Sequence, residues 1–150
     1  MRYLRRIFGK SFWVTLLIKQ NKYHRFGVFR HTIAVFLHTL KDKNYKMLPA
    51  ALLHDIAKPF SAFQDENDIL TGEYSFHNHE EFSYKIIKNW PISEYTKNLV
   101  RYHYIIRAMQ KATQKNKILK YQRLQRKFDK LDPYFINDLK TFMKYDDLGK

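Results

Sequence analysis

The stretch AALLHDIAKP, residues 50–59, places His54 and Asp55 directly after an unbroken run of apolar side chains. Pro49 suits the first turn of a helix, and Pro59 cannot continue the hydrogen-bond ladder of one. The stretch therefore predicts a helix that begins near Pro49 and closes at Pro59. Two adjacent groups that can bind a metal ion lie where apolar spacing predicts a buried helix face.

The rest of the chain also favours helices over strands. Gly and Pro are scarce, at four each in 150 residues, and Val, Ile and Thr do not form alternating runs. With 45% hydrophobic residues at this length, we expect one compact domain around a single core. We predict an all-α fold of about six to seven helices. Besides the helix between the two prolines, apolar spacing predicts helices at residues 3–20, 28–40, 79–90, 93–106 and 133–148.

Two segments lack a strong helical pattern. Residues 60–78 show no periodicity, carry four acidic residues and no Lys or Arg, and contain Gly72, so we expect a long loop of the kind that tends to be functional. Residues 111–130 are basic and weakly amphipathic. We expect them either as a helix on the surface or as a mobile arm.

Several predicted helices carry a polar side chain on their apolar stripe. His31, His54 and His103 each lie on that face. In the last helix Asp146 shares the i, i+3, i+4, i+7 spacing of three apolar residues, whereas Asp147 would face outward. A buried ionised carboxylate costs several kcal/mol or shifts its pKa, and a divalent cation shared with neutral imidazoles removes that cost.

Any metal here must be held by histidines and carboxylates, because the chain contains no cysteine. The same absence excludes disulfides and cysteine nucleophiles, and fits a reducing compartment. Nitrogen and oxygen donors suit Zn, Mn, Fe, Ni, Co or Mg and do not select among these divalent ions. Each residue alone is weak evidence, since a lone histidine on an apolar face is more often a core residue.

The net charge of +14 is unevenly distributed. Residues 1–41 carry nine Lys or Arg and no acid, and residues 101–130 carry ten against one Asp. Residues 64–81 hold six acids and no Lys or Arg. Such a field attracts polyanions, so a phosphate-bearing small molecule or a nucleic acid is the expected partner. The alternative is a basic, solvated surface that binds nothing.

The order H…HD…D resembles the HD superfamily of metal-dependent phosphohydrolases. RHTIAVFLHTL (30–40) looks like the family's first histidine helix, AALLHDIAKP like its central motif, and MKYDDLGK (143–150) like its closing aspartate motif. FHNHEEFSYKI (76–86) is similar to a His-Glu segment in the HD regions attached to bacterial tRNA nucleotidyltransferases, and VRYHY (100–104) to a further histidine site. The resemblance covers about residues 28–148 as an HD core, leaving 1–27 as an N-terminal helix and linker.

Carried over by position, the resemblance implies four ligands for a first metal ion: His31, His54, Asp55 and Asp146. His79 and His103 would hold a second ion, or would contact the substrate phosphate if only one ion is bound. Asp55 would also orient the attacking water or take its proton.

Three further residues have implied roles that compete with simpler ones. Lys58 matches the lysine of an HDxxK pattern and would neutralise a phosphoryl oxygen, or would only complement a helix dipole. Arg30 is a candidate phosphate clamp or a surface charge. Glu80 would orient an imidazole, or would only favour the start of its helix. His38 and His77 do not match the family pattern; we expect packing for the first and a substrate or orienting contact for the second.

The resemblance implies a phosphomonoesterase or phosphodiesterase that acts on a nucleotide, a cyclic phosphate or an RNA end through a metal-activated water. One alternative is a basic nucleic-acid-binding accessory protein without turnover, which would use residues 101–130 with Tyr102, Tyr104 and Tyr121. Another is a structural metal site in an accessory subunit. SFWVTLLI (11–18) is too short to span a bilayer, so we expect a cytoplasmic protein without a transmembrane segment, and a homo-oligomer is possible.

Overall fold

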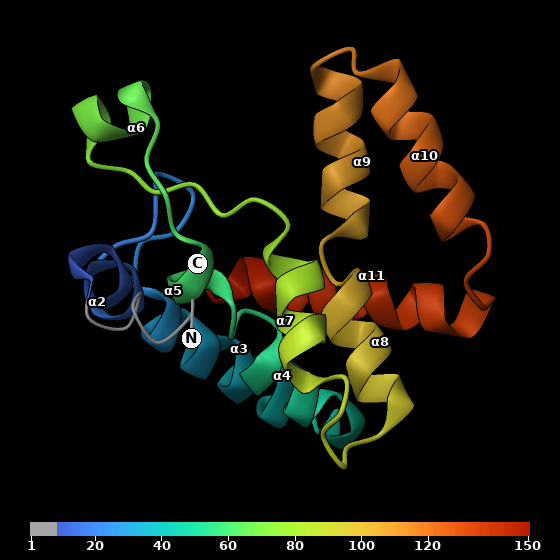
Figure 1. Cartoon of the computed structure of the whole chain (residues 1–150). Helices are drawn as coiled ribbons and strands as arrows, with labels where there is room; N and C mark the ends of the chain where they lie inside the picture. The colour runs from blue at the N-terminus through green and yellow to red at the C-terminus, as the bar shows by residue number, and fades with distance from the viewer. Residues whose placement is uncertain (1–8) are drawn as a thin grey trace.

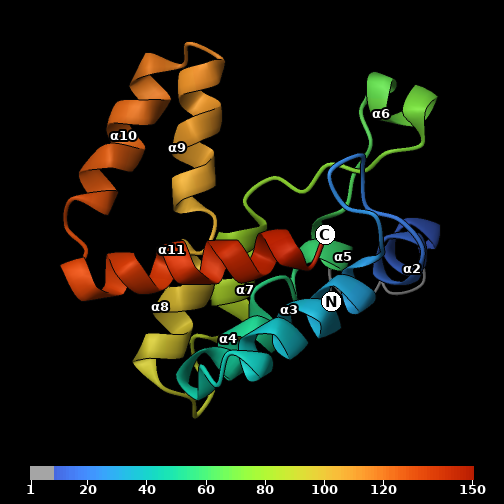
Figure 2. The same ribbon diagram turned by 180° about the vertical axis from the view of Figure 1, so that it is seen from behind.

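The computed structural model describes residues 9–150, and within them the chain folds into α-helices joined by turns and loops, without a strand (Figures 1 and 2). This confirms the all-α prediction. The helices are α2 (Lys10–Leu17), α3 (Val28–Lys41), the 3-10 turn η1 (Tyr45–Met47), α4 (Leu48–Leu53), α5 (Lys58–Ser61), α6 (Glu66–Thr71), α7 (His79–Ile87), α8 (Glu94–Tyr102), α9 (Ile105–Gln114), α10 (Ile118–Phe128) and α11 (Pro133–Leu148). They exceed the six to seven expected because short helices occupy segments that sequence spacing joined or left as loop.

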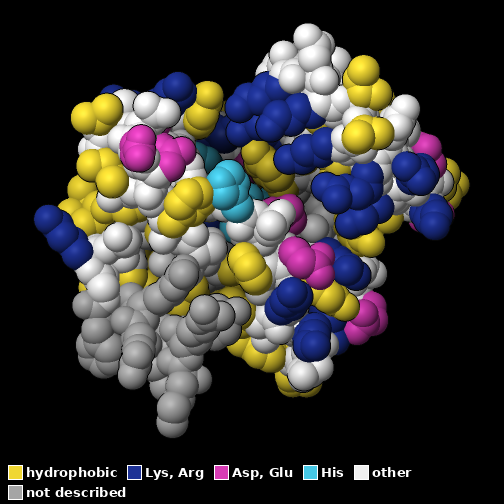
Figure 3. All heavy atoms as spheres, turned by 45° about the horizontal axis from the view of Figure 1, so that its top comes forward, with side chains coloured by type: hydrophobic (Ala, Val, Ile, Leu, Met, Phe, Trp, Pro, Cys, Tyr) yellow, Lys and Arg dark blue, Asp and Glu magenta, His cyan; other side chains and the backbone are white. Residues whose placement is uncertain are grey.

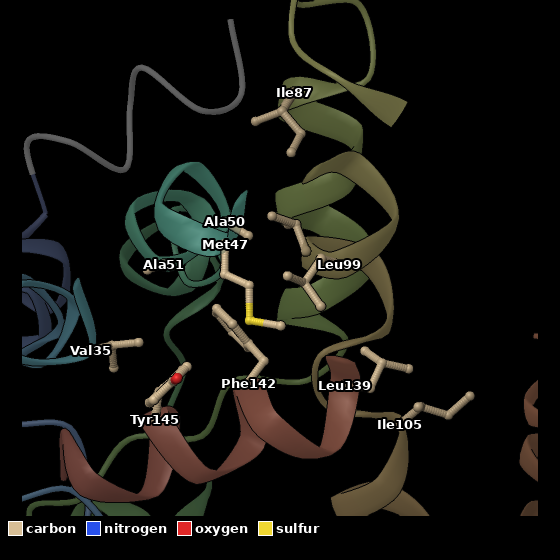
Figure 4. Close-up of a cluster of buried hydrophobic side chains, with 11 residues drawn as sticks. Val35, Met47, Ala50, Ala51, Ile87, Leu99, Ile105, Leu139, Phe142 and Tyr145 are labelled. Atoms are coloured by element: carbon tan, nitrogen blue, oxygen red, sulfur yellow. The ribbon is translucent and has the colours of Figure 1, made fainter. Parts of the chain in front are cut away.

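The core lies where α3, α4, α8 and α11 meet. Phe142 of α11 and Met47 of η1 are fully buried, and Figure 4 shows them pointing toward each other beside Leu99 of α8. Val35 of α3 is also fully buried and closes the cluster on the other side. Burying large apolar side chains of this kind contributes about 1.5–3 kcal/mol each. This packing fixes the relative positions of the helices that carry the polar inward residues.

Local signals placed several helix ends correctly. α3 begins at Val28, as predicted. α11 begins at Pro133, and Asp132 caps it by accepting hydrogen bonds from the backbone N–H groups of Tyr134 and Phe135. Ser93 caps α8 in the same way. Proline at the first helical position and a short polar acceptor before it satisfy the otherwise unpaired N–H groups of a first turn.

The predicted helix between the two prolines is wrong at its C-terminal end. α4 ends at Leu53, a turn follows, and Pro59 lies in the first turn of the separate helix α5. A proline has no N–H to extend the ladder, but it is tolerated in a first turn, where that N–H needs no partner. His54 and Asp55 therefore lie on a turn between two helices.

The prediction of an unstructured loop at residues 60–78 is also wrong in part. Asp65 and Asp68 form a reciprocal capping box that starts α6, and Gly72 ends it with a φ of 65°. Paired caps of this kind stabilise a short helix without an apolar stripe, which is why periodicity missed it.

Two other boundaries differ from the sequence-based expectations. The helix predicted through residue 106 breaks at His103 and Tyr104, and the basic segment forms the antiparallel pair α9 and α10, which rises from α11 (Figures 1 and 2). The surface-helix alternative for residues 111–130 is therefore correct. The helix predicted at 3–20 is described only as α2, because residues 1–8 lie outside the described part.

No helix within residues 9–150 has the length and apolar content needed to cross a membrane.

Candidate metal centre

Six polar side chains from five separate elements converge in the interior. His31 comes from α3, Asp146 from α11, and the other four lie at or next to helix ends: His54, Asp55, His79 and His103. Each of the six is at most 8% exposed. The structure thus brings together the residues that the resemblance implied as ligands.

Three of the histidines use one local arrangement to fix the ring. In each, Nδ1 donates to the backbone carbonyl three residues earlier: His54 to Ala51 at 2.9 Å, His79 to Phe76 at 3.1 Å and His103 to Val100 at 2.7 Å. A carbonyl only accepts, so the neutral ring carries its proton on Nδ1 and keeps a lone pair on Nε2. Such bonds also satisfy carbonyls that helix ends leave unpaired.

His31 reaches the same state through a distant partner. Its Nδ1 donates to the carbonyl of Gly149 at 3.0 Å, across 118 positions of sequence. A Cβ on residue 149 would lie 2.7 Å from Val35 Cγ2, so only glycine permits this close approach. All four rings therefore turn Nε2 toward the centre of the cluster, as histidine ligands of metals usually do when a second partner holds Nδ1.

Asp55 lies between two groups of donors. Oδ2 is 3.3 Å from His54 Nε2 and 3.5 Å from His31 Nε2, while Oδ1 is 3.4 Å from His79 Nε2 and 3.8 Å from His103 Nε2. Two sets of residues therefore have the spacing of metal ligands, and both include the Asp55 carboxylate. The first set is His31, His54 and Asp55, and the second is Asp55, His79 and His103.

Asp146 lies beside the two histidines of the first set, although the set with metal-binding spacing does not include it. Its Oδ1 lies 3.0 Å from His31 Nε2 and 3.7 Å from His54 Nε2. Donors about 2.1 Å from a tetrahedral ion would be separated by about 3.4 Å, and the facing atoms of His31, His54 and Asp55 lie 3.3–3.5 Å apart. Both oxygens of Asp55 are buried and accept no hydrogen bond of normal geometry. The spacing, the free lone pairs and the unsatisfied carboxylate all fit a divalent ion.

The pKa values follow burial and charge. Burial, together with the nearby Lys58, lowers the pKa of His79 to about 3, and burial with His54 lowers that of His103 to about 4, so both rings are neutral at pH 7. Burial alone would lower the pKa of His54, but the negative charge of the adjacent Asp55 carboxylate outweighs it and raises the pKa. Without a metal, a proton on His54 supplies part of the positive charge that Asp55 requires.

The two carboxyl groups remain ionised. Burial would raise the pKa of Asp55, but His54 and Lys58 outweigh it and hold the pKa well below its usual value. Burial is likewise outweighed at Asp146, where the contact with His31 and the charge of His54 lower the pKa. The cluster therefore offers charged carboxylates and, at His79 and His103, neutral imidazoles, the forms in which these groups bind cations.

Lys58 is buried against the cluster and is not a surface cation at a helix end. Its Nζ lies 2.7 Å from Asp55 Oδ2, at angles poor for a hydrogen bond, and donates to Gln20 Oε1 at 3.0 Å. Gln20 is itself fully buried and donates to the carbonyl of Phe26. The segment that follows α2 thus orients a cation next to the shared carboxylate.

Two residues near the cluster were missed from sequence. Arg107 of α9 donates from Nη2 to Asp146 Oδ2 at 3.1 Å and to Asp147 Oδ1 at 2.9 Å, which leaves Asp146 Oδ1 free to face the histidines. The ring of His24 packs edge-on against that of His31 at 4.8 Å, and burial, with Lys58, lowers its pKa to about 2. His24 lies in a turn without periodicity, and Arg107 is one of many cations in its segment, so no pattern distinguished either.

Of the other residues considered from sequence, Arg30 and His77 lie outside the cluster, whereas Glu80 lies beside it. Arg30 is exposed and stacks on Phe26, with Cζ 3.8 Å from the ring centre, and does not reach the cluster. His77 is exposed and packs against Phe63. Glu80 Oε2 lies 3.5 Å from His79 Nδ1, near enough to orient that ring. Burial raises the pKa of the Glu80 carboxyl group.

The cluster forms the floor of a large hollow of about 1320 Å³. Asp55, Lys58, His79, His103 and Asp146 line it, so the donors are accessible from outside through this opening. Figure 3 shows histidine side chains at this hollow, with Lys and Arg gathered on the side formed by α9 and α10. A metal ion and an anionic substrate can both enter here.

Comparison with known proteins supports the resemblance stated from sequence. A family model described as "HD domain" matches residues 28–134, which is well over half of the chain, although it stops before Asp146. None of the curated proteins and none of the solved structures matches the chain. With the buried histidines and aspartates described above, the match leads to one conclusion: the chain belongs to the HD domain family.

Proposed function

We propose that this protein is a metal-dependent phosphohydrolase that cleaves a phosphate monoester or diester of a nucleotide, a cyclic phosphate or an RNA end. The observation that carries the proposal is the shared carboxylate of Asp55, whose two oxygens face separate pairs of histidine nitrogens at the floor of an open hollow. Such an arrangement could hold two metal ions close together, as in many enzymes that displace a leaving group from phosphorus.

Each residue has a distinct task in this proposal. His31, His54, Asp55 and Asp146 would hold a first divalent ion of the Mn, Mg, Zn, Fe, Ni or Co type, and His79 and His103 with Asp55 a second. Divalent ions held by such donors polarise phosphoryl oxygens and lower the pKa of water toward neutrality.

Charges beside the donors complete the site. Lys58 Nζ, next to Asp55, would neutralise charge that develops on a phosphoryl oxygen. Arg107 holds the Asp146 carboxylate in position through its Oδ2. Asp55 would orient the attacking water or accept its proton as the P–O bond to the leaving group breaks.

The second candidate function is nucleic-acid binding without turnover, which the cations of α9 and α10 favour. It predicts binding that is independent of metal and no release of product.

The decisive experiment is a screen of phosphate esters, including 2′,3′-cyclic nucleotides, with metal-loaded protein and with the double variant His54→Ala/Asp55→Ala. The proposal expects hydrolysis that needs the metal and is lost in the variant. His38→Ala is a matched control, since His38 lies on α3 like His31 but neither joins the cluster nor lines the hollow. Hydrolysis that persists in the double variant would come from a contaminant, and binding of RNA without hydrolysis would favour the second candidate.

A further inference from the structure

We propose that the substrate of this site is a single-stranded nucleic acid whose backbone lies along α9 and α10, and this inference rests on the proposed phosphohydrolase function. It narrows that function from any phosphate ester to a strand several nucleotides long.

Both helices direct their cations into the hollow. On α9 these cations recur every four residues, and from the start of α10 onward they recur every three or four, so each set forms one stripe. The hollow is lined by the α9 set Arg107, Lys111 and Lys115 and by the second set Lys117, Lys120, Arg123, Lys127 and Lys130. α9 begins two residues after His103, so its stripe leads outward from the metal cluster.

Almost none of these cations is paired with a carboxylate within residues 9–150. Residues 105–128 contain no Asp or Glu. Of the cations in the two stripes, only Arg107 forms an ion pair with a carboxylate in the described part of the chain. Like charges three or four residues apart destabilise a helix by about 0.2–0.5 kcal/mol per pair. A stripe of this kind has a positive potential that a bound chain of phosphates would neutralise.

Aromatic rings begin at the metal cluster and continue along the same wall. The ring of Tyr104 packs on that of His79 at 5.2 Å. Lys111 Nζ lies 5.4 Å from the Tyr104 ring centre and 5.1 Å from that of Tyr23, which is 59% exposed. Stacking of bases on exposed aromatic rings beside a cationic groove is how proteins bind single strands with little sequence preference. An inorganic polyphosphate would make no use of these rings.

The length and polarity of the wall also fit a strand. Lys117 and Lys127 are ten residues apart, so this part of the stripe spans about 15 Å. At about 3.4 Å per phosphate in a helical strand, that distance corresponds to about four nucleotides. Asp68 of α6 and the nearby Glu73 also line the hollow, and α6 lies across from α9 and α10 in Figure 1, so an anionic strand is favoured at the α9 and α10 wall.

The test measures binding separately from catalysis. A fluorescein-labelled 12-nucleotide RNA, and its DNA equivalent, are titrated by anisotropy with chelator present, at several salt concentrations. The stripe variant is Lys120→Ala/Arg123→Ala/Lys127→Ala. Its control, Arg126→Ala/Lys140→Ala/Lys144→Ala, removes the same charge from neighbouring positions that do not line the hollow.

The stripe variant should reduce the slope of log K against log salt by about 2, and should bind roughly 100-fold more weakly at 0.1 M salt, because three phosphate contacts are lost. The control should change affinity less than threefold. Tyr23→Ala/Tyr104→Ala should weaken oligonucleotide binding but not the binding of polyphosphate. Equal losses in the stripe variant and its control, or an unaffected tyrosine variant, would overturn the inference.

Catalysis then separates this inference from the proposed function. With metal present, the stripe variant should lower the ratio of kcat/KM for a 12-nucleotide strand to kcat/KM for bis(p-nitrophenyl) phosphate by tenfold or more. An unchanged ratio in an active enzyme would reject binding of the strand along α9 and α10 but would leave the proposed phosphohydrolase function intact. Tight binding of the strand that depends on the stripe, with no hydrolysis of any ester, would reject the phosphohydrolase function but leave strand binding along α9 and α10 intact.

Discussion

If the site binds two divalent ions as proposed, Asp55→Asn should reduce the number of bound ions from two to at most one. The Asp55 carboxylate presents one oxygen to each histidine pair, Oδ2 to His31 and His54 and Oδ1 to His79 and His103. Asparagine has the same shape but only one oxygen; its NH₂ group donates and cannot bind a cation. One of the two metal positions must therefore lose a ligand and face a donor in its place.

The size of the effect follows from linkage between binding and folding. At an ion concentration 100 times Kd, each ion stabilises the folded chain by about 2.7 kcal/mol, and two ions by about 5.4 kcal/mol. For a chain of 150 residues, 1 kcal/mol corresponds to about 2–4 °C in Tm. The wild type should thus gain about 11–22 °C when Mn²⁺ is added, and Asp55→Asn no more than half of that gain.

The assay is equilibrium dialysis against Mn²⁺ with metal analysis of the protein, together with Tm measured with and without the ion for each variant. His79→Ala/His103→Ala, which affects one side only, should retain one ion and half of the gain in Tm. His38 lies on the same helix as His31 but outside the cluster, so the control variant His38→Ala should retain two ions. If Asp55→Asn binds as many ions as the wild type and gains as much in Tm, the carboxylate does not bridge two sites.

Three further perturbations test the surroundings of the cluster. Gly149→Ala should weaken metal binding by about 10- to 100-fold. The added Cβ would lie 2.7 Å from a valine methyl of α3 and would shift the carbonyl that orients His31. Unchanged metal affinity in dialysis would contradict this. Lys58→Met should lower the free energy of unfolding of the metal-free protein by about 3 kcal/mol, since it leaves a buried carboxylate without its ion pair. The loss in urea unfolding should be smaller with Mn²⁺ present, and equal losses would refute the role of that pair. Between pH 6.5 and about 4, the unfolded chain binds protons that His79 and His103, with pKa values of about 3 and about 4, do not bind when folded. The metal-free protein should therefore lose up to about 1.4 kcal/mol per pH unit for each of these rings as pH falls through this range; stability that stays flat over this range would show that the rings are not buried and neutral.

Local sequence rules determined most helix positions and the direction of several polar side chains. Asp132 and Pro133 set the start of α11, and the spacing along that helix assigned Asp146 to the interior and Asp147 to the surface, as the structure has them. These features depend on contacts within one or two turns, which spacing in the sequence reports directly. The same rules failed around Pro59, because a proline that ends one helix can equally begin another.

Tertiary packing alone decided how the inward groups meet. The order of motifs predicted which residues would be ligands, but not that Asp55 would stand between two histidine pairs, nor that His31 would be held by a carbonyl 118 positions away. Arg107 reaches Asp146 only because α9 rises beside the end of α11. Crossing angles between helices depend on side chains distant in sequence. Sequence spacing therefore shows which side of each helix turns inward, and the packed core determines which atoms come within reach of one ion.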